Sequence, residues 1–157
     1  MSLVIVGAGP NLGAAVARRF GREGMAVGLI ARDRARLDAL AAELAATGLA
    51  VDVAAATAVV GPMLDAGSGT ILFTTGGAAV NPNPLRAGVG ISFAAEVAYA
   101  RMLHDVLRDR GIHVGHTAVG GRIAPGAEHE PEDVAEVLWR QHTERTEFQV
   151  RLGVDVP

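Results

Sequence analysis

The sequence contains no cysteine and no lysine among its 157 residues. Without cysteine, the chain forms no disulfide, no thiolate metal site and no cysteine nucleophile. All 14 basic residues are arginine, so any mechanism that needs a lysine as base, Schiff-base former or cofactor clamp is excluded. Aromatic residues make up only 4% of the chain, with Tyr99 as the single tyrosine, so small aliphatic side chains must fill the core.

Long hydrophobic runs and a basic stripe are also missing. No apolar run approaches the length that spans a bilayer, and the net charge of −3 with dispersed arginines argues against nucleic acid or an anionic membrane as partner. A strand begins almost at the N-terminus, which leaves no room for a charged leader and hydrophobic segment. We therefore expect a cytoplasmic protein with a single domain over residues 1–157.

A glycine-rich turn near the N-terminus is the most informative stretch. It follows the apolar run 3–6 and opens onto a helical pattern, so free backbone N–H groups and the positive helix end point at one spot. This arrangement predicts a dinucleotide site, with a purely structural turn as the alternative. The expected cofactor-binding residues here are Gly7, Gly9, Pro10, Asn11, Leu12 and Gly13.

Strand and helix patterns alternate along the rest of the chain. The pattern predicts strands at 3–6, 25–30, 49–53, 70–74, 112–118 and 148–152, and helices at 11–23, 34–47, 54–66, 91–110 and 131–141. Residues 76–90 and 120–131 read as loops just past strand ends, where ligands bind in open α/β sheets. The expected fold is α/β, a Rossmann-like doubly wound parallel sheet with helices on both faces.

These motifs resemble the short-chain dehydrogenase/reductase family over nearly the whole chain. The family's Gly-x-x-x-Gly-x-Gly turn falls on Gly7, Asn11 and Gly13, and asparagine is the residue after glycine that best tolerates positive φ. Arg32 sits where NADP-preferring members hold the 2′-phosphate, so the resemblance implies NADP(H) rather than NAD(H); the alternative is a solvated loop charge. The further cofactor positions that it implies are Asp52 and Val53 near adenine, Thr74 and Gly76 after the fourth strand, and Gly121 and Ile123 around the nicotinamide.

Two departures set this chain apart from the family. Only residues 54–67 separate the third strand from the Gly-Thr-Ile strand, so the Asn-Asn-Ala-Gly strand is missing and the fold is shortened by about one β-α unit. The Tyr-x-x-x-Lys pair aligns with Val89 and Phe93, and Tyr99 is followed four residues later by Leu103. Because neither valine nor phenylalanine transfers a proton, ketone reduction by the family mechanism is not expected.

Other groups could carry chemistry in the same region. The candidate catalytic residues are Thr75, Ser92, Glu96 and Tyr99; a glutamate base requires that burial raise its pKa. Each has a structural alternative: an intrahelical hydrogen bond for Ser92, a solvated carboxylate for Glu96 and a packed aromatic for Tyr99. A metal site is not expected, because His113 and His116 lie three apart on a strand and face opposite sides.

Three functions remain open from the sequence. The chain is an NADP(H)-binding reductase-like enzyme with a rebuilt active site, a non-redox enzyme (cyclase, dehydratase or isomerase) that uses the same cleft, or a non-catalytic partner subunit. A small-molecule ligand suits the first two. Small residues in helices 54–66 and 91–110 predict a homo-oligomer through these helices, or a mixed complex with a full-length relative.

Overall fold

The computed structural model describes residues 2–6, 9–30, 34–46, 51–52 and 60–154. The chain divides into two compact units: unit 1 takes Met1–Val60 and Ile123–Trp139, and unit 2 takes Gly61–Arg122 and Arg140–Pro157. Each unit contains a three-stranded parallel sheet with helices packed against it. The α/β class and the parallel strands expected from the sequence are confirmed.

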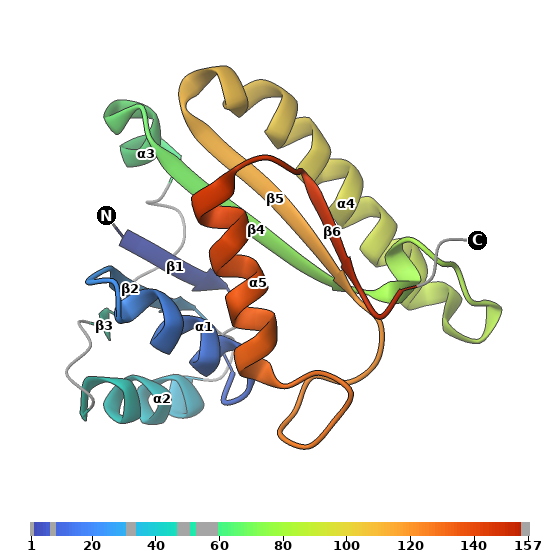
Figure 1. Cartoon of the computed structure of the whole chain (residues 1–157), viewed down its shortest axis with the longest axis horizontal. Coiled ribbons are helices and arrows are strands. Elements are labelled where there is room, and N and C mark those ends of the chain that lie inside the picture. Colours follow the sequence, from blue (N-terminus) through green and yellow to red (C-terminus); the bar gives the residue numbers. More distant parts are fainter. Residues whose placement is uncertain (1, 7–8, 31–33, 47–50, 53–59, 155–157) are drawn as a thin grey trace. The chain divides into compact units, whose positions relative to one another are not determined.

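Unit 1 is built on the sheet β1 (Ser2–Val6), β2 (Ala26–Ile30) and β3 (Val51–Asp52). The register pairs Val6 with Ile30 and Gly28 with Asp52, so the three strands end at the same edge. Helices α1 (Leu12–Gly21) and α2 (Arg34–Ala46) belong to this unit (Figure 1). Its core contains an aliphatic cluster of Ala14, Ala17, Val27, Leu29, Leu40 and Leu44. The unit also buries Phe20, whose ring meets Trp139 edge-on with the centroids 5.0 Å apart.

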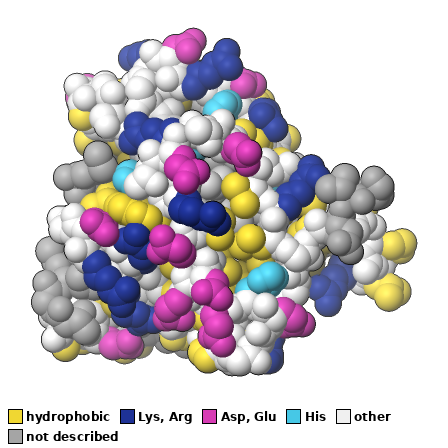
Figure 2. Space-filling model, in the orientation of Figure 1, with side chains coloured by type: hydrophobic (Ala, Val, Ile, Leu, Met, Phe, Trp, Pro, Cys, Tyr) yellow, Lys and Arg dark blue, Asp and Glu magenta, His cyan; other side chains and the backbone are white. Residues whose placement is uncertain are grey.

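Ion pairs join α1 to its neighbours within unit 1. Arg18 reaches Glu43 of α2 at 3.5 Å and Glu132 of α5 (Pro131–Glu144) at 3.1 Å, and Arg19 pairs with Glu136. The Arg19 guanidinium also lies 4.3 Å from the ring centroid of Trp139. Figure 2 shows arginine and acidic side chains interspersed on this face of the molecule. Glu132 and Glu136 of α5 therefore both pair with arginines of α1.

Unit 2 is built on the sheet β4 (Gly69–Gly76), β5 (Ile112–Val119) and β6 (Gln149–Leu152), in that order. Helix α4 (Ala87–Leu107) lies along one face, where Leu107, Ile112 and Val114 form the core with Met63 and Leu64 of α3 (Val60–Ala66) around it (Figure 1). The last turn of α5 contacts the other face, since Gln141 accepts a hydrogen bond from Thr117 at 2.6 Å. Both faces of β5 are covered, which explains why all eight of its residues are buried.

Several element boundaries differ from the sequence expectation. The segment 76–90 is not a simple loop: β4 continues to Gly76, short 3-10 helices η2 (Gly77–Ala79) and η3 (Pro84–Arg86) follow, and α4 begins at Ala87. Asn83 caps η3 by accepting from Leu85 N at 2.9 Å, and proline suits the first position of a helix. Helix α4 ends at Leu107, and a third 3-10 turn, η4 (Arg108–Arg110), leads to Gly111. Of the expected helix 54–66, residues 54–59 lie outside the described part of the chain.

Candidate functional site

The carboxyl edge of the β1–β2–β3 sheet collects the predicted cofactor residues of unit 1. The strands are parallel, Val6 pairs with Ile30 and Asp52 pairs with Gly28 near the end of β2, so the three carboxyl ends lie at one edge of the sheet. Asp52 is placed there by its backbone in β3, and Gly9–Gly13 form the turn into α1. Gly7, Arg32 and Val53 lie outside the described residues. The described part of the predicted site is thus brought to one edge, the edge where ligands bind in such sheets.

The turn presents an open helix N-terminus. The first turn of α1 contains no acidic residue, and the side chain of Asn11 makes no capping hydrogen bond. Asn11 has φ −90°, so the turn does not use the positive φ that asparagine tolerates; it closes through Ala14 N to Gly9 O at 2.9 Å. A Cβ added at Gly9 would meet no atom within 4 Å. The backbone at Gly9 is therefore open to a ligand, while Gly13 is buried against the unit.

In unit 2, the carboxyl end of β4 holds three predicted site residues. Thr74 is exposed, whereas Thr75 on the opposite face is only 5% exposed. A Cβ at Gly76 would lie 2.9 Å from the ring of Phe93, so this ring packs directly on the glycine. Phe93 is one of the two residues at which the sequence resemblance places the family's Tyr-x-x-x-Lys pair, and its ring fills this space with carbon.

Thr75 belongs to a buried polar chain that the sequence did not reveal. Its Oγ1 lies 2.8 Å from Nε2 of His116, and Nδ1 of His116 lies 3.1 Å from Nε2 of Gln149. His116 is fully buried and stacks on Phe148 with ring centroids 6.3 Å apart. Thr75 is thus held by β5. Its hydroxyl bonds to His116 and not to the other predicted catalytic residues, Ser92, Glu96 and Tyr99.

The protonation of His116 follows from its partners. Arg151 donates to Oε1 of Gln149 at 3.3 Å, which turns the Gln149 amide nitrogen toward His116. Nδ1 of His116 then accepts, so the ring carries its proton on Nε2 and donates it to Thr75. Burial, with a smaller contribution from Arg101, lowers the pKa of His116 to about 4. A neutral ring that already donates to Thr75 does not act as a base for that hydroxyl.

Ser92, Glu96 and Tyr99 lie on one stripe of α4. Ser92 is exposed and donates to Gly88 O at 3.1 Å, which is the intrahelical bond given above as its structural alternative. Burial raises the pKa of Glu96, which is half-buried. Tyr99 is 52% exposed and touches the edge of Phe73, so it is not the packed aromatic that the sequence suggested. Of Ser92, Glu96 and Tyr99, Glu96 is the group whose pKa is shifted by its surroundings.

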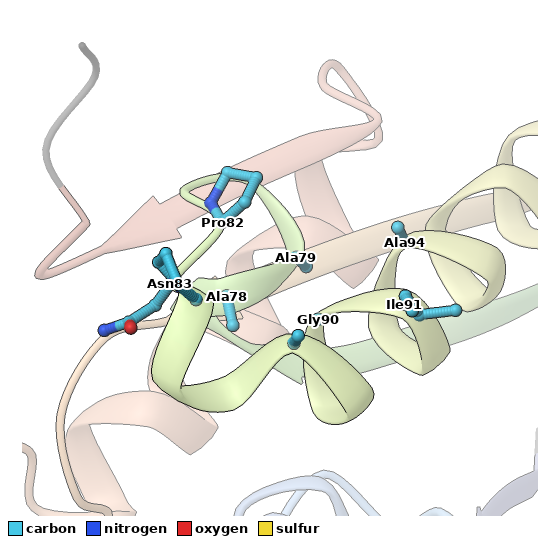
Figure 3. A pocket seen from close by; sticks show the side chains of 9 residues that line it. Ala78, Ala79, Pro82, Asn83, Gly90, Ile91 and Ala94 are labelled. Carbon is cyan, nitrogen blue, oxygen red and sulfur yellow. The ribbon is translucent and has the colours of Figure 1, made fainter.

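A pocket of about 390 Å³ lies where the η2–η3 segment meets the first turns of α4. Figure 3 shows Ala78, Ala79 and Pro82 on one side and Gly90, Ile91 and Ala94 on the helix. The amide of Asn83 extends away from Ile91 and Ala94 in this view. None of the four predicted catalytic residues lines the pocket; its lining consists of Ala78, Ala79, Pro82, Asn83, Pro84, Ala87, Gly90, Ile91 and Ala94.

The loop after β5 carries the remaining predicted residues. Gly121 has φ +94° and is exposed, a backbone conformation that glycine adopts without strain. Ile123 is half-buried and forms a bridge with His129, and Glu130 accepts from Gly126 N at 2.7 Å. The loop 123–131 is therefore held by its own hydrogen bonds.

Within the described ranges, no three His, Cys, Asp or Glu side chains are placed to hold a metal ion. In the same part of the chain, no helix combines the length and the apolar character that crossing a membrane requires.

The sequence missed the Thr75–His116–Gln149 chain because strand register is a tertiary property. Alternation along β5 indicates which residues share a face with His116, but only pairing of Phe73 with His116 brings Thr75 within reach. The sequence does contain one signal: two histidines and a threonine, His113, His116 and Thr117, stand among the apolar residues of a buried strand, where polar groups need partners.

Solved structures with a similar fold are known. No protein-family model matches the sequence, and no curated protein matches it either. A 3-ketoacyl-ACP reductase from Sinorhizobium meliloti 1021 superposes with a TM-score of 0.83 at 16% identity, covering 97% of each chain. A metagenomic short-chain oxidoreductase in complex with NADP gives 0.77 at 21% identity, covering 98% of each chain. A short-chain dehydrogenase from Sphingobium yanoikuyae in complex with NADPH gives 0.79 at 20% identity, covering 96% of this chain and 86% of that one. This protein therefore has the Rossmann-like fold of the short-chain dehydrogenases/reductases.

Proposed function

We propose that this chain is a member of the short-chain dehydrogenase/reductase family that binds NADP(H) at the carboxyl edge of β1–β2–β3. The observation that carries the proposal is the likeness along almost the whole chain to structures solved with NADP and with NADPH. The residues of the turn fit such a ligand. The uncapped start of α1 offers N–H donors and a positive dipole end, and Gly9 leaves room for a pyrophosphate.

Substitution of Gly9 tests this site directly. Gly9→Ala meets no protein atom, so the fold should persist while the new methyl group obstructs the pyrophosphate. Gly61→Ala is the matched control, since a Cβ there also meets nothing within 4 Å and Gly61 lies in α3. Titration calorimetry should show NADPH binding that weakens at least about tenfold in Gly9→Ala and is unchanged in Gly61→Ala. Arg32→Ala should weaken NADPH more than NADH, because only NADPH carries the 2′-phosphate.

Two results would overturn the proposal. One is no binding of either nucleotide up to about 1 mM. The other is a folded Gly9→Ala variant that binds NADPH as well as the parent. Nucleotide binding without hydride transfer to any carbonyl compound would favour the non-redox enzyme, and failure to bind nucleotide would favour the non-catalytic partner subunit.

We further propose that the chemistry does not use a tyrosine–lysine pair. Val89 and Phe93 occupy those positions, and the Phe93 ring packs on Gly76. Glu96 is the proposed acid/base because burial raises its pKa and it lies one helical turn from Phe93. For any activity found, Glu96→Gln should remove the limb of the pH–rate profile that Glu96 sets; an unchanged profile would exclude it.

Self-association through α4 is a separate proposal. The outward stripe in the second half of this helix is apolar, with Met102 61% and Val106 70% exposed. Alanines at 95 and 98 lie on the same stripe and are also exposed, so another helix could approach closely. We propose that α4 of a second copy covers this stripe; a full-length relative is the alternative partner.

Light scattering after gel filtration tests this contact. The parent should elute as a dimer or larger species at micromolar concentration, and Met102→Glu should shift it to monomer, since burying an unpaired carboxylate is costly. Ala46→Glu, an exposed position on α2, is the control and should leave the mass unchanged. A monomeric parent would refute self-association and leave the mixed complex to be tested.

A further inference from the structure

We infer that the pocket between the η2–η3 segment and α4 binds a small, uncharged, mainly aliphatic molecule. That this molecule is the substrate rests on the proposed function; that the pocket binds it does not. The pocket volume of about 390 Å³ lies within the range of small-molecule sites, roughly 300–1,000 Å³.

The chemistry of the lining selects the ligand. The residues around the pocket include no aspartate, glutamate, arginine or histidine, and eight of the nine are alanine, glycine, proline or isoleucine. The polar exception, Asn83, uses its side-chain oxygen to accept from Leu85 N, and its amide extends away from Ile91 and Ala94 (Figure 3). A carboxylate or phosphate entering this space would meet no charged side chain among the lining residues to offset its lost hydration. An aliphatic group would lose only its contact with water, which is favourable.

The pocket is shaped by the backbone before any ligand arrives. Local hydrogen bonds fix the η2–η3 segment, from Val80 N and Asn81 N to Gly77 O and from Arg86 N to Asn83 O. Pro82 and Pro84 restrict the chain further. On the helix side, Gly90 faces the segment: a Cβ there would lie 3.6 Å from Ala78 O, at ordinary contact distance. A pre-formed pocket loses little conformational entropy on binding.

A neutral and a charged probe of the same length separate the chemistries. The ketone 2-heptanone and the carboxylate heptanoate are titrated into the parent protein with methyl-labelled alanine and isoleucine. The methyl signals of Ala79, Ile91 and Ala94 should shift with 2-heptanone, while Ala14 in unit 1 stays unchanged. Heptanoate should bind at least about tenfold more weakly.

Two glycines of α4 provide matched variants. Gly90→Leu places a side chain in the pocket and should weaken 2-heptanone at least about tenfold. Gly88→Leu adds the same side chain where a Cβ meets nothing within 4 Å and should leave binding unchanged. If Gly90→Leu does not fold, Ala94→Leu, at another lining position, replaces it.

The inference is overturned by equal or tighter binding of heptanoate, by unchanged ketone binding in a folded Gly90→Leu or Ala94→Leu variant, or by no ketone binding at about 10 mM. It is also overturned if the pocket methyl signals shift with protein concentration and the ketone does not compete, because a second copy then covers the pocket. The titrations are repeated with saturating NADPH. If the protein binds the ketone but not NADPH, the pocket inference stands and the proposed function is refuted. If it binds NADPH but not the ketone, the proposed function stands and the pocket inference is refuted.

Discussion

Replacing His116 tests the buried polar chain of unit 2 through the pH dependence of stability. His116 is fully buried and bonded to Thr75 and Gln149, and its pKa falls from 6.5 to about 4. In the unfolded chain His116 is protonated below about pH 6.5, whereas in the folded chain it is protonated only below about pH 4. The contribution is fully present above pH 6.5 and is lost as the pH falls. Each pKa unit is worth about 1.4 kcal/mol, so the loss reaches about 3 kcal/mol.

Urea unfolding followed by circular dichroism at several pH values measures this loss. The free energy of unfolding of His116→Gln should fall less between pH 6.5 and 4 than that of the parent, by up to about 3 kcal/mol. Thr75→Val is the control: it removes the hydroxyl but leaves His116 buried, so it should lower stability while keeping the pH slope of the parent. Parallel curves for His116→Gln and the parent would refute a buried, neutral His116.

Three further substitutions test other parts of the fold by urea unfolding. Gly111→Ala should destabilise the protein by at least about 1–2 kcal/mol, because Gly111 has φ +74° and a Cβ there would meet the carbonyl oxygen of Gly67; a loss below about 0.5 kcal/mol would contradict this geometry. Arg19→Met should cost only about 1 kcal/mol, since its ion pair with Glu136 is partly exposed, and a cost well above that would mean that the cation over Trp139 matters more than expected. Glu96→Gln should stabilise the protein at neutral pH, because the raised pKa of Glu96 means that its charged form is disfavoured in the fold; the gain should vanish as the pH falls below about 4, and no gain at neutral pH would contradict its burial.

Most of the helices and strands could be predicted from local sequence patterns. The glycines that follow three of the helices, Gly24, Gly67 and Gly111, adopt positive φ in the structure. The strands were found because each is an apolar run between such breaks, and β6 pairs with β5 at the sheet edge as expected. The start of α4 was misplaced because Gly88 and Gly90 weaken the helical pattern and the Asn-Pro pairs indicate a loop. Tertiary packing overrides that weak propensity, since the helix lies against β5.

The candidate site was predicted less completely because it depends on register and packing. The turn residues Gly9–Gly13 could be named from the chain, since an anion site at a strand–turn–helix junction is a local feature. The pairing of Thr75 with His116 and the packing of Phe93 on Gly76 each join residues from different elements. Sequence spacing alone places Ser92 and Glu96 on one helix face, but it does not show that the Ser92 hydroxyl donates a hydrogen bond to Gly88 O.

The contact between Phe93 and Gly76 connects the missing lysine to the character of the pocket. At the carboxyl end of β4, an aromatic ring covers the glycine, and the adjoining pocket is lined by alanine, glycine and proline. A cation in this apolar setting would need a carboxylate or solvent for compensation. Apolar packing of Phe93 on Gly76 instead holds the helix on the sheet without a buried charge. The same packing removes the group that would lower the pKa of a catalytic tyrosine, so restoring Tyr at Val89 alone should not produce ketone reduction. Ketone reduction by Val89→Tyr with Phe93 intact would show that the ring does not block this chemistry.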